Sequence, residues 1–325
     1  MLDPAPTAWI VTDGKAGDEA QCIGVADALG LMTSVRRVAP RAPWSWLMPW
    51  GPIDPAERPG RPGSPIAPPF PDLLIASGRR AAAYVRHVKR AAGGRTFTVV
   101  LKDPRVGAGA ADLIWVPEHD RLRGPNVIST LTPPHRISAE RLAQARANPP
   151  PAIAALAPPR AAVLVGGDSR HFTFSDDDVR AFASQLAALA DSGVALMGTL
   201  SRRTPASLGA TVRHVFDHHG GWLWDGSGEN PLIPLLAMAD AIVATADSTN
   251  MVGEAAATGK PILVFTPGGR GHRKITHFLD EMRVKGIVHN FAGRLEGKPY
   301  PPLDSTPEIA EAIAKRYRAL RRTHP

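Results

Sequence analysis

The strongest constraint on the fold of this chain is the repeated alternation of short apolar runs with longer segments of helical character. The runs of the first half are 9–12, 73–77, 97–101, 113–116 and 127–129, and those of the second half are 161–165, 195–199, 211–216, 241–245 and 262–265. Short buried strands that alternate with helices form parallel sheets covered by helices. The pattern therefore predicts an α/β protein.

A proline- and alanine-rich stretch, "NPPPAIAALAPPR" (148–160), separates the two series of runs. It has no polar helical face, which is typical of an interdomain linker. The chain has 325 residues, enough for two domains. We therefore expect two doubly wound, Rossmann-like domains facing across a cleft, 1–150 and 151–305. A final helix at 306–322 lies far in sequence from the last strand, so we expect residues 306–325 to pack back on the first domain.

Charge, cysteine content and the N-terminal sequence limit the binding partners and the cellular compartment that we expect for this protein. The net charge is +8 and the pI is near 10.0, so the protein attracts anions. The basic residues are scattered and form no zinc-finger or RNA-binding signature, so we expect no nucleic-acid partner. The single cysteine, Cys22, fits a reducing compartment. The N-terminus has no basic region followed by a long apolar one, so we predict a cytoplasmic protein without a signal peptide.

Polar and glycine-rich loops follow nearly every predicted strand. In a parallel sheet, the loops at the carboxyl ends of the strands line the ligand crevice. The loop "GGDS" is Gly166, Gly167, Asp168 and Ser169, and "SRR" is Ser201, Arg202 and Arg203. Glycine amides and guanidinium groups both bind phosphate oxygens, so we predict an anion site here. The alternatives are a plain turn at the glycines and a solvated pair of arginines.

The stretch "ADAIVATADSTNMVGEAAATGKPILVF" (239–265) predicts a strand, a small-residue helix and a second strand. Asp247 or Ser248 can N-cap the helix, which Gly259 ends. Asn250 and Glu254 are four residues apart and share one helix face. Capping does not explain Glu254, whereas an acid at this place suits a pair of ribose hydroxyls.

This stretch is similar to the nucleotide-sugar signature of GT-B glycosyltransferases, especially the lipid-linked N-acetylglucosamine transferases, in which a matching Glu holds the ribose. Five motifs together resemble the mitochondrial-fission family first named for elongated plant mitochondria: "TDGKAGDEAQCIGVADAL", "VGGDSRHF", "LSRRTP", "WDGSGENP" and "TADSTNMVGEAAATGKP". They span residues 12–261, which is most of the chain.

The resemblance implies a glycosyltransferase that uses a nucleoside-diphosphate sugar of the UDP type and a lipid or envelope glycan acceptor. Two alternatives stay open: a nucleotide-sugar epimerase on the same fold, and a non-catalytic, membrane-associated nucleotide-binding protein. We expect no cofactor besides the sugar donor. We also expect no metal, because no paired-aspartate loop suits a metal that bridges a diphosphate.

A transferase needs a general base from the first domain. The resemblance places Asp18 where the transferases have a histidine, although Asp18 can equally N-cap a helix at 19–29, which is the reading that we favour. His119 follows a predicted strand, and histidine has an unperturbed pKa closer to neutral pH. We rank Asp18 first by position and His119 second by chemistry.

The segment "APWSWLMPWGP" (42–52) concentrates apolar side chains between prolines: Trp44, Trp46, Leu47, Met48 and Trp50. One interpretation is a core plug under a loop. The other is an exposed segment at a membrane surface, where tryptophan prefers the headgroup region. With the basic charge, this predicts peripheral contact with an anionic membrane, at its inner face.

Overall fold

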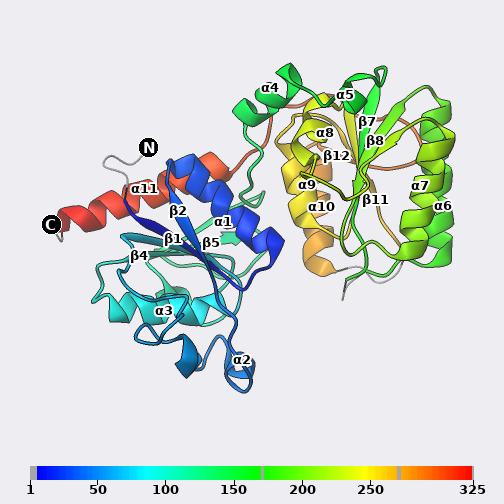
Figure 1. The fold of residues 1–325 in the computed structure, drawn as a ribbon. Coiled ribbons are helices and arrows are strands. Elements are labelled where there is room, and N and C mark those ends of the chain that lie inside the picture. The colour runs from blue at the N-terminus through cyan, green and yellow to red at the C-terminus, as the bar shows by residue number, and fades with distance from the viewer. Residues whose placement is uncertain (1–5, 170–171, 269–271, 324–325) are drawn as a thin grey trace. The chain divides into compact units, whose positions relative to one another are not determined.

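The computed structural model describes residues 6–169, 172–268 and 272–323. The chain divides into two units, each drawn in Figure 1. Unit 1 is Met1–Arg136 with Ser305–Pro325, and unit 2 is Ile137–Asp304. Each unit has one six-stranded sheet in which every strand pairing is parallel. The predicted α/β class with two doubly wound units is confirmed.

In unit 1 the strand order is β2-β1-β3-β4-β5-β6, so the chain reverses direction across the sheet between β1 and β3. Its elements are β1 (Ala8–Thr12), α1 (Ala16–Leu29), β2 (Thr33–Arg37), α2 (Trp44–Leu47), η1 (Pro55–Glu57), β3 (Leu73–Ser77), α3 (Ala81–Ala91), β4 (Phe97–Leu101), η2 (Ala108–Ala110), β5 (Leu113–Pro117), β6 (Val127–Thr130) and α11 (Thr306–Thr323).

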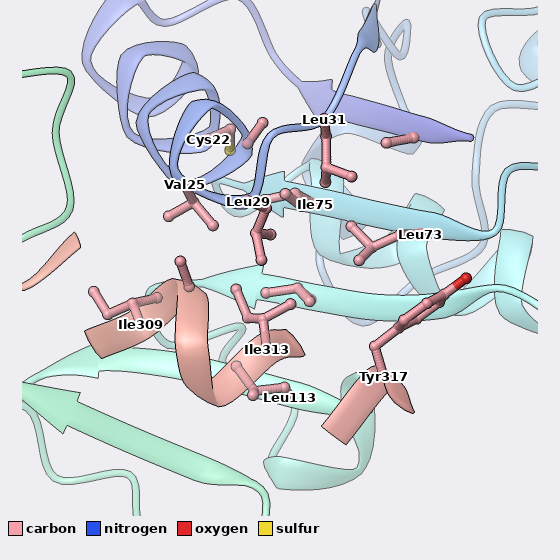
Figure 2. Packing of buried hydrophobic residues seen from close by; sticks show 14 of the residues in the cluster. Cys22, Val25, Leu29, Leu31, Leu73, Ile75, Leu113, Ile309, Ile313 and Tyr317 are labelled. Atoms are coloured by element: carbon pink, nitrogen blue, oxygen red, sulfur yellow. The ribbon is translucent and has the colours of Figure 1, made fainter. Parts of the chain in front are cut away.

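Alternate residues of the central strands of unit 1 supply two separate cores. Leu73 and Ile75 face the core under α1 and α11, whereas Leu74 and Ala76 face the core under α3. A strand that is buried on both faces must be apolar at every position, which is why the runs are continuous. Figure 2 shows Ile313 of α11 packed among side chains of α1 and the strands.

The C-terminal helix α11 belongs to unit 1. The Ser305 and Thr132 hydroxyls lie 2.7 Å apart, and the Thr306 hydroxyl accepts from the His135 amide. Ile309 and Ile313 are fully buried in the core under α1.

The division between the units falls at 136/137 and not at residue 150. Helix α4 (Ala139–Ala147) lies in unit 2, where Arg146 donates to the carbonyl of Ala237 in α8 (Leu232–Met238). The proline-rich stretch therefore runs inside unit 2 and contains the short helix α5 (Pro151–Ala154).

In unit 2 the strand order is β12-β11-β10-β7-β8-β9, with the first strand of the unit, β7, at the centre. This is the order of a dinucleotide-binding sheet, whose ligand crevice lies where the order reverses, between β7 and β10. The remaining elements are β7 (Arg160–Val165), α6 (Asp176–Asp191), β8 (Ala195–Leu200), α7 (Ala206–His218), β9 (Trp222–Leu223), β10 (Ala241–Thr245), α9 (Thr249–Ala256), β11 (Ile262–Phe265), α10 (Arg273–Val284) and β12 (Val288–Asn290).

One predicted strand is wrong. Residues 211–216 lie in helix α7, whose buried side chains include Leu208, Val212, Val215 and Phe216. Their spacing of four, three and one follows the helical period, and the β-branched composition of the stretch misled the strand prediction.

One part of the tryptophan segment is buried in the core and another part is exposed, so each of the two interpretations holds for part of it. Met48 is completely buried in the core under α3. In contrast, Trp46 is 72% exposed, Trp50 63% and Leu47 47%. Within the described residues, no helix is long and apolar enough to cross a membrane.

Candidate functional site

Three strand-end loops meet at the switch point of unit 2. Strands β10, β7 and β8 are neighbours in the sheet, and the loops after them carry Asp247, Gly166–Gly167 and Arg203. The sequence predicted that these loops converge, and the structure brings them into direct contact.

Asp247 is the hub of this contact. Its side chain is completely buried, and it accepts hydrogen bonds from the Thr245 hydroxyl at 2.6 Å, the Gly167 amide at 3.2 Å and the Arg203 guanidinium at 2.7 Å. Three donors, one of them charged, offset the cost of burying a carboxylate. Asp247 therefore ties the loops together and does not cap α9.

The two glycines are required for close packing. A Cβ on Gly166 would lie 1.9 Å from an Asp247 carboxylate oxygen, and one on Gly167 would lie 2.0 Å from the Arg203 carbonyl oxygen. Only glycine fits at either position.

The amides of this loop are already donated within the protein, so the amide nest that the sequence predicted does not form from them. Gly166 donates to Thr245, Gly167 to Asp247, Asp168 to the Arg203 carbonyl and Ser169 to the Phe172 carbonyl. The Asp168 carboxylate accepts from the Phe174 amide.

The two arginines differ in their surroundings. Arg203 is paired with Asp247 and also donates to the carbonyls of Gly167 and Asp168. The Ser201 hydroxyl accepts from the Arg203 amide, which fixes the turn. Arg202 is exposed and forms no ion pair with any residue that the structure describes. Of the two, Arg202 is therefore the cation available to an anionic ligand.

Helix α9 begins as predicted, with the Ser248 hydroxyl accepting from the Met251 amide. Asn250 lies in its first turn, and Glu254 lies one turn further on. Glu254 is half-buried, and burial raises its pKa to about 7. Its carboxyl group has no hydrogen-bond or ionic partner within the described ranges. A half-buried acid without a partner among the described residues, in a small-residue helix, is suited to accept hydrogen bonds from a ligand's hydroxyls.

A second polar cluster lies at the switch point of unit 1, between β1 and β3. Asp18 is buried in the first turn of α1 and forms an ion pair with Lys102. The N-cap residue of α1 is Lys15, so the capping role favoured for Asp18 is wrong. A Cβ on Gly78 would lie 3.3 Å from an Asp18 oxygen and 3.5 Å from an Asp13 oxygen, so both carboxylates border this glycine.

Several features of this cluster were missed by sequence reasoning. Lys102 has a φ of 84°, which is uncommon for a residue with a Cβ and is frequent at functional sites. The Asp13 Oδ1 and Ser77 Oγ atoms are buried and have no hydrogen-bond partner among the described residues. The sequence could have indicated these residues through their position, since Asp13, Ser77 and Lys102 all lie at the carboxyl ends of strands.

His119 follows β5, which lies three strands from β1 in the sheet. Lys102 follows β4, the neighbour of β5, so His119 lies one strand from the Lys102 end of this cluster and three strands from β1, the strand that precedes Asp18. No group of three or more metal-ligating side chains occurs in the part of the chain that is described.

Known structures with the same fold include enzymes of nucleotide-sugar chemistry. S. aureus MnaA, solved with UDP, superposes with a TM-score of 0.55 at 11% identity over 97% of this chain and 87% of that chain. A putative UDP-N-acetylglucosamine 2-epimerase from Listeria monocytogenes gives 0.55 at 12% identity, with the same coverage. The spinosyn forosaminyltransferase SpnP gives 0.52 at 13% identity over 98% and 94%. The fold is therefore GT-B-like, as predicted.

Sequence comparison identifies the family. The mitochondrial fission protein ELM1 of Arabidopsis thaliana is 28% identical over 274 residues, which are 75% of this chain and 64% of that protein. An uncharacterized protein of Rickettsia prowazekii (strain Madrid E) is 31% identical over 160 residues, 47% of this chain and 45% of that protein. The match thus spans less than two thirds of either relative. Residues 16–317 match the family described as Mitochondrial fission ELM1, and the chain belongs to this family.

Proposed function

We propose that unit 2 binds a nucleoside-diphosphate sugar at the switch point between β7 and β10, and that the protein transfers the sugar to a lipid-linked or glycan acceptor. Glu254 carries this proposal, because its partly buried carboxyl group has no partner among the described residues and follows the loop at the switch point. A ribose diol would supply the two donors that this group lacks. The uridine nucleotides bound by proteins of this fold support UDP as the first ligand to test.

The anionic part of the ligand would be held mainly by Arg202. It is the exposed cation of the "SRR" loop, while Arg203 already holds Asp247. Ser248 and Asn250 at the start of α9 would contribute polar contacts near the positive end of the helix. Asp168 and Ser169 shape the neighbouring loop.

Calorimetric titration with UDP tests the donor site. Arg202→Gln is expected to weaken binding by about 1–3 kcal/mol, the scale of a charge-assisted hydrogen bond. Arg213→Gln, which removes another exposed cation of unit 2, is the matched control and should bind like the wild type. Binding should also persist in a chelator of divalent metals. Absence of UDP binding by the wild-type protein would refute the donor site.

For the transfer step we propose Asp18 as the general base, with Lys102 fixing its carboxylate through their ion pair. His119 remains the second candidate. Asp18→Asn should lower turnover by roughly 10²–10⁴ and leave the affinity for UDP unchanged, whereas His119→Ala should retain most of the activity. Full activity of Asp18→Asn together with inactivity of His119→Ala would reverse the assignment.

Epimerisation is a second candidate, favoured by the two carboxylates, Asp13 and Asp18, that border Gly78. An epimerase removes a proton from a sugar carbon and returns one from the opposite face. In deuterated water it would therefore place deuterium on that carbon without consuming an acceptor, whereas transfer would release UDP. UDP-sugar binding with neither outcome would indicate a non-catalytic nucleotide-binding protein.

A further inference from the structure

An exposed surface of unit 1 combines apolar and cationic side chains outside the sites described above. We call it the Trp–Arg surface, and it consists of Trp46, Leu47, Trp50, Arg58, Arg86 and Arg90. It lies on the α3 side of the sheet, where the long connection between β2 and β3 carries helix α2 (Figure 1).

The apolar part of this surface is held firmly although it is exposed. Met48, between the exposed Leu47 and Trp50, is completely buried in the core under α3. Arg86 of α3 donates to the carbonyl of Pro49. The segment is thus anchored at Met48 and Pro49 while Trp46 and Trp50 face outward, an arrangement that folding of unit 1 alone does not require.

The cationic part borders a hollow of about 510 Å³ lined by Trp50, Arg58, Arg86, His87 and Arg90, among others. A second hollow, of about 550 Å³, shares Arg86 and Arg90 with the first. Trp50 therefore stands directly beside the cations, so apolar and basic groups form one continuous surface.

These cations lack acidic partners. No carboxylate of the described chain forms an ion pair with Arg58, Arg86 or Arg90, and the Arg86 Nε atom is buried without a hydrogen-bond acceptor. Of two nearby acids, Asp54 pairs with Arg41, whereas Glu57 accepts from the neutral Tyr84 hydroxyl and keeps its charge, so the three arginines outnumber it. Burial and the adjacent Arg90 lower the pKa of Arg86, and burial together with Arg90 and Arg58 lowers the pKa of His87. The hollow is therefore a region of positive potential.

We propose that the Trp–Arg surface docks the protein on a bilayer of anionic phospholipid, with Trp46, Leu47 and Trp50 in the headgroup region and the Arg58–Arg86–Arg90 hollow around a lipid phosphate. Tryptophan prefers the membrane interface, and arginine binds phosphate in a forked geometry. Docking combines apolar burial with attraction to anionic lipid, and this surface supplies both. The inference does not depend on nucleotide binding in unit 2.

Flotation of the full chain with vesicles tests this proposal. The protein should float with vesicles of phosphatidylcholine and phosphatidylglycerol, should stay behind with phosphatidylcholine alone, and should be released by high salt. Trp46→Ser/Trp50→Ser should reduce binding by about tenfold or more. Arg58→Gln/Arg90→Gln should reduce it by roughly fivefold for each cation. All four positions are exposed, so circular dichroism and thermal melting should match the wild type.

The matched control is Val284→Ser/Lys285→Gln, which removes an exposed apolar residue and an adjacent cation from unit 2 and should bind vesicles like the wild type. Equal binding to neutral vesicles, or equal loss in the control, would overturn the proposal. So would saturable binding of inorganic phosphate without any vesicle binding. A wild-type dimer that Trp46→Ser/Trp50→Ser dissociates would instead assign the surface to a second copy of the chain.

Discussion

At the scale of single residues, Asp247 shows how one buried carboxylate can hold three strand-end loops together. It joins the loops after β7, β8 and β10 through Gly167, Arg203 and Thr245. The sequence predicted that these residues gather, because parallel strands end at one edge of a sheet. It did not predict which arginine is paired, because that depends on side-chain directions and not on spacing.

We expect Asp247→Asn to destabilise unit 2 by about 3 kcal/mol, because an amide leaves Arg203 without its charge partner and places a donor among donors. Denaturant unfolding followed by circular dichroism measures this change. Asp280→Asn is the control: it removes an ion pair with Arg283 in which the Asp280 side chain is 60% exposed, and it should change stability by less than about 0.5 kcal/mol. Equal effects of the two substitutions would show that Asp247 is not a structural hub.

Glu254 leads to a prediction about pH. Burial raises its pKa from the ordinary value of about 4.5 to about 7 in the folded protein, so the folded state binds this proton more tightly than the unfolded state. Its contribution to stability is therefore complete below about pH 4.5 and is lost as the pH rises through 7. Glu254→Gln removes this loss, so the variant should gain stability relative to the wild type between pH 5 and pH 8, by about 3 kcal/mol at most. A difference in unfolding free energy between Glu254→Gln and the wild type that stays constant at all pH values would contradict this prediction.

At the scale of elements, the buried strands were predictable and the exposed ones were not. Each residue of β3 is buried, which gives a continuous apolar run, whereas the edge strand β2 is Thr33–Arg37 with exposed polar residues. Strands β9 and β12 have only two and three residues, too few to show a period. The helix start at Ser248 was predictable because a cap is a local signal. Asp18 misled the same reasoning, since its carboxylate reaches Lys102, a residue far away in sequence.

Helix α11 should stabilise unit 1 selectively. Ile313→Ala removes a fully buried side chain from the core shared with α1 and is expected to cost about 2–5 kcal/mol. Glu311→Ala, on the exposed side of the same helix, is the control. Hydrogen exchange should show lost protection in β1, β3 and β4, with β7 and β10 unchanged. Equal loss of protection in both units would mean that they unfold as one.

At the scale of the whole molecule, the two doubly wound units followed from the two series of apolar runs. The boundary at 136/137 did not, because a proline-rich stretch looks like a linker even where it is packed. Its position in unit 2 depends on α4 contacting α8, some 90 residues later in the chain. Local composition does not predict a contact between segments so far apart in the sequence, so only the three-dimensional structure shows the boundary.

The return of α11 to unit 1 has a consequence for how the chain is made. The ribosome releases residues 1–136 before unit 2, yet the core that they form lacks Ile309, Ile313 and Tyr317 until helix α11 has emerged. Unit 2, which is continuous in sequence, can finish folding while the earlier unit still exposes an apolar face under α1. Unit 1 therefore emerges in part before unit 2 but is completed only after it, and a message truncated before α11 would leave unit 1 open to chaperones and proteases.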